Sequence, residues 1–368
     1  MAEFRNKEVS IAFDICGCPN RCRHCWLGLP PEKKHMPEKE VFEKFEEIKK
    51  AVSKGVFEPH LSRIKLFDSW FYEPDFSKDY AKFYEKELKY NNGENYREKF
   101  ELISTWRFAQ DDNYAKWIKE IGMKKAQITL FGLEETTDWF YRRKGAFKGN
   151  LLATQKMLDL GIQPRWQLFL TKKILSELGG IMELVKELRL RERVKELGGD
   201  FDIYIHDPGP EGEARKLQYL RPELEDIAVI PEELIISSEK YLKGKLEWYT
   251  EAELVKEIQA EEDILPARKP NPGISCLFVM SNWDVYSNYF TMEKWWKLGN
   301  LKTEPLQKII GNFIKDTPFG YNALKKVKAK QLVKEFGDIK SRKIYGDKNS
   351  LLVYYFEEYC EAKVPFVP

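Results

Sequence analysis

The order of apolar patterns along residues 8–206 is the feature that most restricts the fold. Short apolar runs rich in β-branched and aromatic residues alternate with segments in which apolar residues recur every three or four positions. This alternation predicts an α/β fold of parallel strands joined by right-handed helical crossovers. Periodicity alone allows either an open doubly wound sheet or an incomplete barrel. The expected strands are residues 9–15, 63–67, 100–105, 126–132, 164–170 and 201–206.

Four of the six cysteines lie within ten positions, directly after the first expected strand. Cys18, Cys22 and Cys25 have the spacing CxxxCxxC. Three thiolates this close on one loop can hold three irons of a [4Fe-4S] cluster and leave the fourth iron without a protein ligand. Loops after parallel strands carry the active sites of α/β proteins. The cysteines therefore stand where chemistry is expected.

Two other interpretations use part of the same cysteine set. Structural zinc needs four tetrahedral ligands, usually as two CxxC-like pairs with a longer spacer, and would require Cys16 as the fourth. Cys16 ends a strand, and we expect a small buried residue there. A redox pair of Cys22 and Cys25 leaves Cys18 without a role. The spacing favours an iron-sulfur cluster, with zinc as the alternative.

A CxxxCxxC motif directly after the first strand of a six-fold βα repeat resembles the radical S-adenosylmethionine (SAM) superfamily. The resemblance covers about residues 8 to 207. It implies a partial (β/α)6 TIM-like barrel and one [4Fe-4S] cluster whose open iron chelates SAM. It also implies reductive cleavage of SAM to a 5′-deoxyadenosyl radical, which abstracts a hydrogen atom from a substrate.

The resemblance also assigns contacts to SAM. His24, before the third cysteine, matches a position whose backbone contacts the adenine. The family's "GGEP"-like stretch corresponds to Phe71-Tyr72-Glu73-Pro74, in which Glu73 would hold the SAM amino group with the backbone. Both glycines are aromatic here, although glycine usually stands where a ligand approaches the backbone. The other matched positions are Ser104, Thr129 (with Phe131 replacing the usual Asp nearby), Arg142, Arg143 and Gln167.

Several further residues lie at or just past expected strand ends and are candidates for the substrate side. Two tryptophans could wall a pocket, and a His-Asp pair could orient a substrate or move a proton. A thiol near the barrel mouth could donate a hydrogen atom to a substrate radical, although packing is the more common role of a buried cysteine. The candidates are Asp68, Trp70, Trp106, His206, Asp207 and Cys276.

The chain changes character beyond residue 207, and we expect a radical SAM core over 1–207 and a smaller α+β extension over 208–368. Residues 283–288 ("WDVYSN") and 298–309 ("LGNLKTEPLQKI") resemble the SPASM or twitch extension, which caps the substrate in many radical SAM enzymes. Only two cysteines, Cys276 and Cys360, follow the first cluster. We therefore expect a relative without an auxiliary cluster.

Composition sets limits on partners and location. No apolar run approaches the ~20 residues that span a bilayer, and the N-terminal residues lack the apolar region of a signal peptide. We therefore expect a cytoplasmic protein that is not associated with a membrane. The formal net charge of +2 gives no reason to expect nucleic acid. The family implies a flavodoxin- or ferredoxin-type electron donor.

The substrate would be a small molecule or a peptide, with epimerisation, dehydrogenation or bond formation as possible outcomes. Seventeen residues precede the cysteine motif, which favours a small molecule or a peptide delivered by a separate leader-binding protein. A ribosomal-peptide maturase working with such a partner is one alternative. A non-catalytic zinc or iron-sulfur regulatory protein is an alternative from another class.

Overall fold

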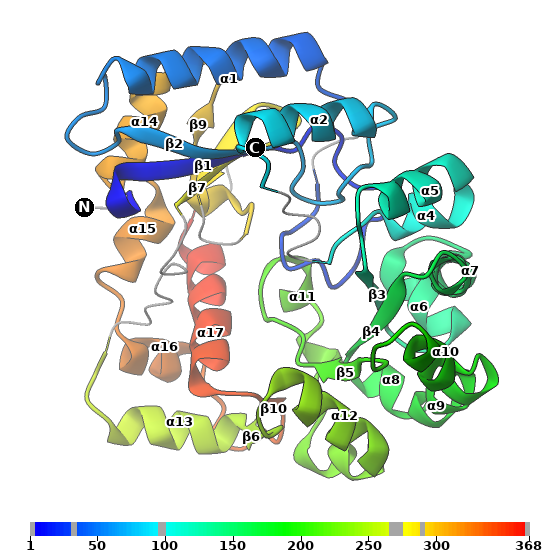
Figure 1. The fold of residues 1–368 in the computed structure, drawn as a ribbon. Helices are drawn as coiled ribbons and strands as arrows, with labels where there is room; N and C mark the ends of the chain where they lie inside the picture. Colours follow the sequence, from blue (N-terminus) through cyan, green and yellow to red (C-terminus); the bar gives the residue numbers. More distant parts are fainter. Residues whose placement is uncertain (1–3, 31–34, 95–100, 265–274, 288–290, 365–368) are drawn as a thin grey trace.

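The computed structural model describes residues 4–30, 35–94, 101–264, 275–287 and 291–364. The larger of its sheets has five strands in the order β2-β1-β7-β8-β9. β1 runs parallel to both β2 and β7, whereas β8 is antiparallel to β7 and to β9 (Figure 1). The strand bounds are β1 Glu8–Phe13, β2 Arg63–Asp68, β7 Cys276–Val279, β8 Asp284–Ser287 and β9 Lys297–Asn300.

A second sheet is wholly parallel, with the order β3-β4-β5. Its register places Thr129 beside Gln167 and Phe169 beside His206, so these side chains meet near the carboxyl ends of the strands. A two-stranded antiparallel pair joins β6 to β10. The bounds are β3 Lys125–Leu130, β4 Gln163–Phe169, β5 Ile203–His206, β6 Tyr249–Thr250 and β10 Ile344–Tyr345.

Helices cover both sheets. In Figure 1, α1 and α2 lie over β1 and β2, while α4 to α10 gather around β3 and β4. The helices before β5 are α1 Glu38–Ser53, α2 Tyr80–Tyr90, α4 Thr105–Gln110, α5 Asp112–Glu120, α6 Glu134–Tyr141, α7 Ala146–Asp159, α8 Lys172–Leu175, α9 Leu178–Glu187 and α10 Leu190–Glu196. Those after β5 are α11 Gly212–Arg215, α12 Glu232–Leu242, α13 Glu251–Ala260, α14 Leu306–Ile314, α15 Phe319–Leu324, α16 Ala329–Phe336 and α17 Lys348–Lys363.

The apolar spacing of the sequence accounts for how these helices pack. Helix α1 buries Val41, Phe45, Ile48 and Val52, which recur at three- and four-residue intervals and therefore form one face. This face belongs to a core shared with β1, β2, β7 and the C-terminal helices. A second core surrounds β3 to β5 and their helices. A third, smaller cluster lies beside the cysteine loop, with Cys22 packed against it, whereas Cys16 packs against the first core.

The α/β class is confirmed, but the structure does not confirm a partial barrel. The third expected strand is wrong for residues 101–105, and its first residue lies outside the described part. Glu101 has a left-handed backbone, with φ of 55°, and Ser104 caps the N-terminus of α4. One backbone hydrogen bond, from Gln127 N–H to the Glu101 carbonyl (2.9 Å), reaches this segment from β3. The six expected strands therefore do not form one sheet.

The C-terminal region adds strands to the first sheet, because β7 pairs with β1 from Ser10 to Phe13. β7 and β8 form an antiparallel hairpin. Residue 288, the last of the "WDVYSN" stretch, lies outside the described part. Helices α15 and α16 follow as separate elements. The domain boundary at residue 207 stays a prediction. Among the described helices, none has the length and apolar character needed to cross a membrane.

Candidate active site at the cysteine loop

The cysteine motif occupies the loop that follows β1. Burial is the largest cause that raises the thiol pKa of Cys18 and of Cys22. The sulfurs of Cys22 and Cys25 also raise the pKa of Cys18, and the sulfur of Cys25 also raises the pKa of Cys22. Burial also raises the pKa of Cys25 to about 12. The Cys18 sulfur accepts a hydrogen bond from the Asn20 backbone N–H at 3.4 Å. The loop therefore holds three thiols as neighbours in surroundings that favour their neutral form without a metal.

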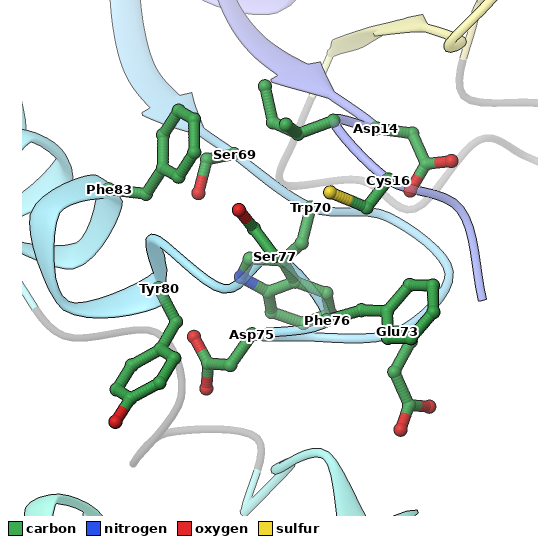
Figure 2. A pocket seen from close by; sticks show the side chains of 11 residues that line it. Asp14, Cys16, Ser69, Trp70, Glu73, Asp75, Phe76, Ser77, Tyr80 and Phe83 are labelled. Atoms are coloured by element: carbon green, nitrogen blue, oxygen red, sulfur yellow. The ribbon is translucent and has the colours of Figure 1, made fainter. Parts of the chain in front are cut away.

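Cys16 has a different environment. Its sulfur lies in the pocket of Figure 2, where Ser77 also points toward the centre. Burial raises the pKa of Cys16 to about 12, and the other groups that affect it are Ser77, Asp14, Arg107 and Asp79. We expected the Cys16 side chain to be buried, but it is only half-buried. This environment agrees with a cluster triad that leaves Cys16 out.

Contacts from three remote segments fix the cysteine loop. The Arg23 N–H donates to the Phe140 carbonyl at 2.8 Å, at the end of α6. Arg143 Nε donates to Asn20 Oδ1 at 2.6 Å. On the other side, the Glu213 N–H donates to the Cys25 carbonyl at 2.9 Å. The loop is thus tied to the second sheet's helices and to α11.

Gly212 allows the last of these contacts. A Cβ at this position would lie 2.6 Å from the backbone atoms Cys25 O, Trp26 O and Gly28 N. Real Cβ contacts are longer than this, and backbone atoms in a packed loop cannot move aside easily. Its φ of 57° also lies in the left-handed region that favours glycine. Position 212 therefore requires glycine for the connector to close against the cysteine loop.

Glu73 lies against the cysteine loop. The Cys18 thiol donates to Glu73 Oε2 at 3.8 Å, and Ser104 Oγ donates to Glu73 Oε1 at 2.7 Å. Burial raises the pKa of Glu73 to about 7, against the lowering effects of Ser104 and of the positive charge of Arg143. Two residues that the resemblance matched to SAM contacts, Glu73 and Ser104, therefore meet beside a motif cysteine.

Asp14 explains how the aromatic residues replace the two glycines of the family stretch. Its Oδ1 accepts the backbone N–H groups of Phe71 (3.3 Å) and Tyr72 (3.2 Å), which fixes the turn before Glu73. Tyr72 also donates its hydroxyl to the Leu27 carbonyl at 3.3 Å. Burial raises the pKa of Asp14 to about 6. Sequence reasoning missed Asp14; its only signal was a carboxylate at the end of a buried strand.

His24 lies inside an aromatic cluster. Its ring centroid is 4.1 Å from that of Phe131 and 4.7 Å from that of Phe169. Its Nδ1 is buried without a hydrogen-bond partner, and burial lowers the pKa of His24 to about 3. The ring is therefore neutral and packs between strand ends of the second sheet. Phe131, which replaces an Asp of the family, forms part of this apolar wall.

The remaining residues matched to SAM contacts fall into two groups. Thr129 Oγ1 donates to Gln167 Oε1 at 3.3 Å, so these two form one polar contact between β3 and β4. Arg142 forms an ion pair with Glu213 at 3.1 Å. Arg143 donates a hydrogen bond to Asn20, and its positive charge lowers the pKa of Glu73. Arg143 is therefore the arginine beside the cysteine loop and the Glu73 carboxyl.

The substrate-side candidates are dispersed. Burial raises the pKa of the Cys276 thiol well above its usual value, and the negative charge of Asp68 raises it further. Trp70 lines the Cys16 pocket with its indole N–H buried and unpartnered, and Trp106 contacts the Phe76 ring at 5.7 Å. The His206 ring lies 5.0 Å from that of Phe169.

Asp207 accepts from the buried guanidinium of Arg221 at 2.8 Å, a structural ion pair. Arg221 also donates to the carbonyls of Ile344 and Pro208, both at 2.8 Å. The second cysteine of the C-terminal region, Cys360, is buried in α17. These contacts assign Asp207 and Cys360 to packing and ion pairing.

The donor set suits an iron-sulfur cluster in its chemistry. Thiolates are the ligands of such clusters, and a bound metal deprotonates a coordinating thiol. The Asn20 N–H already points to the Cys18 sulfur, as amides near cluster ligands do. Within the described ranges, no three His, Cys, Asp or Glu side chains stand in a finished metal-binding arrangement.

Comparisons with known proteins give structural neighbours. No protein-family model matches the sequence, and no curated protein matches it. One similar structure is anSMEcpe with bound AdoMet, at 14% identity and a TM-score of 0.46, covering 96% of this chain and 98% of that chain. A second anSMEcpe structure holds AdoMet and a Kp18Cys peptide, with 14% identity, a TM-score of 0.45, and coverage of 97% and 98%.

A third similar structure is Streptococcus suis SuiB bound to its precursor peptide SuiA, at 10% identity and a TM-score of 0.37. It covers 76% of this chain and 58% of SuiB. The cysteine motif of the chain resembles that of the radical SAM superfamily.

Proposed function

We propose that the protein is a radical SAM enzyme with a single [4Fe-4S] cluster held by Cys18, Cys22 and Cys25. With one electron from a flavodoxin- or ferredoxin-type donor, the bound cluster and SAM supply a 5′-deoxyadenosyl radical that abstracts a hydrogen atom from the substrate. The protein contributes binding, orientation and exclusion of water.

The observation that carries this proposal is the contact between the motif cysteine Cys18 and the Glu73 carboxyl. The thiols are mutual neighbours on one loop, and the Cys18 thiol contacts the Glu73 carboxyl, which Ser104 also holds. A carboxyl fixed beside the cysteine loop suits an ammonium group such as the α-amino group of SAM. The turn that presents Glu73 is fixed by Asp14, although the glycines of the family are absent.

Other residues support the same orientation. Arg143 lies near Glu73 and Cys22, and its forked guanidinium suits a carboxylate. His24 and the aromatic side chains around it form an apolar wall on the side of the second sheet, where a flat ring could pack. Thr129 and Gln167 form the polar contact next to this wall. These roles follow the family match position by position.

The substrate is a small molecule or a peptide. The neighbouring structures include peptides bound to anSMEcpe and SuiB, and a peptide maturase with a separate leader-binding partner remains the alternative within the class. In the other class, a zinc-binding regulator is less well supported, because the groups that affect Cys16 are Ser77, Asp14, Arg107 and Asp79 and not the other motif sulfurs. A cluster-binding regulator without turnover differs from the proposed enzyme in lacking SAM cleavage.

Metal analysis separates these classes. We expect anaerobically reconstituted protein to hold about four irons and four sulfides per chain, as a [4Fe-4S] cluster requires, and to show thiolate-to-iron charge-transfer absorbance. Reduction in the presence of SAM should release 5′-deoxyadenosine. Stoichiometric zinc without charge-transfer absorbance would contradict the proposal. A cluster without release of 5′-deoxyadenosine would leave a regulator and reject the enzyme.

A further inference from the structure

Strand β2 forms one edge of the five-stranded sheet. It runs parallel to β1 on one side, and no other described strand pairs with it (Figure 1). The register with β1 skips Lys65, which therefore has no partner residue in β1. An edge strand presents backbone N–H and C=O groups that can pair with another chain. The outer side of β2 is therefore a surface on which a further strand could be added.

Side chains from α2 and the residue after it close only the far end of this edge. The Phe67 N–H donates to Asn91 Oδ1, and Asn91 Nδ2 donates to the Phe67 carbonyl, both at 2.8 Å. The Asn91 amide thus bonds β2 through one donor and one acceptor, as a neighbouring strand would. Further on, the Ser69 N–H donates to Glu87 at 2.6 Å. Among the described residues, no side chain bonds the backbone of residues 63–66 in this way.

A groove of about 200 Å³ runs along this part of β2. Its lining includes the six consecutive residues 62–67, part of α1, and Tyr90 at the end of α2. Successive side chains of a strand point to opposite faces, so a groove that touches six residues in a row follows the edge of the strand. Phe45, Phe67 and Tyr90 form its aromatic wall, with ring centroids 4.5, 4.9 and 5.6 Å apart. Backbone groups and an aromatic surface are thus offered at the same place.

The charged side chains of this groove are all positive. Lys49, Arg63 and Lys65 line it, all three are exposed, and no acidic residue is among the lining residues. Arg63 pairs with Glu8 at 2.9 Å, and Lys49 lies 4.0 Å from Glu46. Exposed ion pairs of this kind stabilise a protein little, so both cations stay available to other carboxylates. The charge of the groove therefore favours an acidic ligand.

We propose that the outer edge of β2 docks an extended, acidic segment of a partner peptide. The segment adds a strand to β2 through backbone hydrogen bonds, which a nucleic acid could not form, and it places carboxylates near Lys49, Arg63 and Lys65. The edge that Asn91 leaves open sets the length of the segment at about five residues, since paired strands rise by about 3.3 Å per residue. The inference goes beyond the proposed function, because no residue of the cysteine loop lines the groove.

The test titrates the full, cluster-loaded chain with three short peptides in a calorimeter. The first peptide alternates valine with glutamate in three repeats, and the second alternates valine with lysine. The third is the acidic peptide with every backbone nitrogen methylated. We expect the first peptide to bind about ten-fold more tightly than either of the others, because the second loses the charge complementarity and the third loses its backbone donors.

Two charge reversals on the edge locate the binding. Lys65→Glu should lower the affinity for the acidic peptide about ten-fold, and Arg63→Glu repeats the test two positions along the same strand. Lys50→Glu is the matched control, since it makes the same charge change at an exposed position of α1 that does not line the groove. It should keep the affinity of the unmodified chain. Circular dichroism of each variant confirms that it is folded.

Four results overturn the inference: no binding of the acidic peptide, equal binding of the acidic and basic peptides, equal binding of the methylated peptide, or an unchanged affinity in both Lys65→Glu and Arg63→Glu. Tighter binding of a thymidine hexanucleotide overturns it in favour of a nucleic acid. Self-association in sedimentation that the acidic peptide does not reverse overturns it in favour of a second copy of the chain. Release of 5′-deoxyadenosine is measured without any peptide, so a failure of the proposed function is visible separately.

Discussion

Replacement of Gly212 by alanine tests how the connector after β5 holds the cysteine loop. The added Cβ would lie 2.6 Å from three backbone atoms of residues 25, 26 and 28. A non-glycine residue at φ of 57° costs about 1–2 kcal/mol, and overpacking against a fixed backbone costs about 1–3 kcal/mol. Loss of the hydrogen bond from Glu213 N–H to the Cys25 carbonyl adds about 1 kcal/mol. We therefore expect a loss of about 3–6 kcal/mol in the free energy of unfolding.

Gly198→Ala is the matched control. Gly198 also has a positive φ, of 80°, but no atom lies within 4 Å of an added Cβ, so only the backbone cost of about 1–2 kcal/mol applies. Urea unfolding of the metal-free chain measures both variants, and iron content after reconstitution reports on the loop. Equal destabilisation by the two substitutions, with full iron retained in Gly212→Ala, would refute the proposed closure of α11 on the loop.

Three further substitutions test separate parts of the structure. Asp14→Ala removes the acceptor of two backbone N–H groups. We expect it to lower the free energy of unfolding by about 2–3 kcal/mol in urea titrations and to weaken SAM binding in calorimetry. Unchanged SAM affinity would contradict the role given to the turn before Glu73. Arg221→Met removes the ion-pair partner of the half-buried Asp207 and two hydrogen bonds to backbone carbonyls. We expect the free energy of unfolding to fall by about 3–5 kcal/mol in urea titrations. A fall of less than about 1 kcal/mol would contradict a stabilising buried ion pair. In the folded chain the pKa of Glu357 is raised from 4.5 to about 8. Between these two pH values the unfolded chain has lost the Glu357 proton and the folded chain still holds it. The free energy of unfolding therefore falls as the pH rises through this range, by at most about 4–5 kcal/mol. Glu357→Gln should flatten this part of the stability-pH curve, and the same slope in the variant would contradict the raised pKa.

Local patterns in the sequence predict most of the elements around the site. Apolar runs locate β1 to β5 within a few residues, except for the expected strand at 100–105, because a buried parallel strand needs a continuous apolar segment. That segment is apolar too, but Ser104 caps a helix there and Glu101 adopts a left-handed backbone, choices that depend on contacts with Tyr114 and Glu73. Tertiary contacts override a short apolar run.

Features that join distant segments could not be predicted in this way. The pairing of β7 with β1 links residues more than 260 positions apart, and no local period specifies it. The role of Gly212 depends on the approach of another loop, and that of Asp14 on two backbone N–H groups after β2. The meeting of Glu73, Ser104 and Cys18 agrees with positions matched through the family, while the function of each residue stays a prediction.

The central claim is that Cys18, Cys22 and Cys25 hold a cluster that cleaves SAM, and that Cys16 does not belong to it. Release of 5′-deoxyadenosine by the reduced, reconstituted protein measures this most directly, in the unmodified chain and in four single Cys→Ala variants. We expect release by the unmodified chain and by Cys16→Ala, and none by the other three variants. Loss of release and of iron in Cys16→Ala, or release that survives Cys18→Ala, Cys22→Ala or Cys25→Ala, would contradict it.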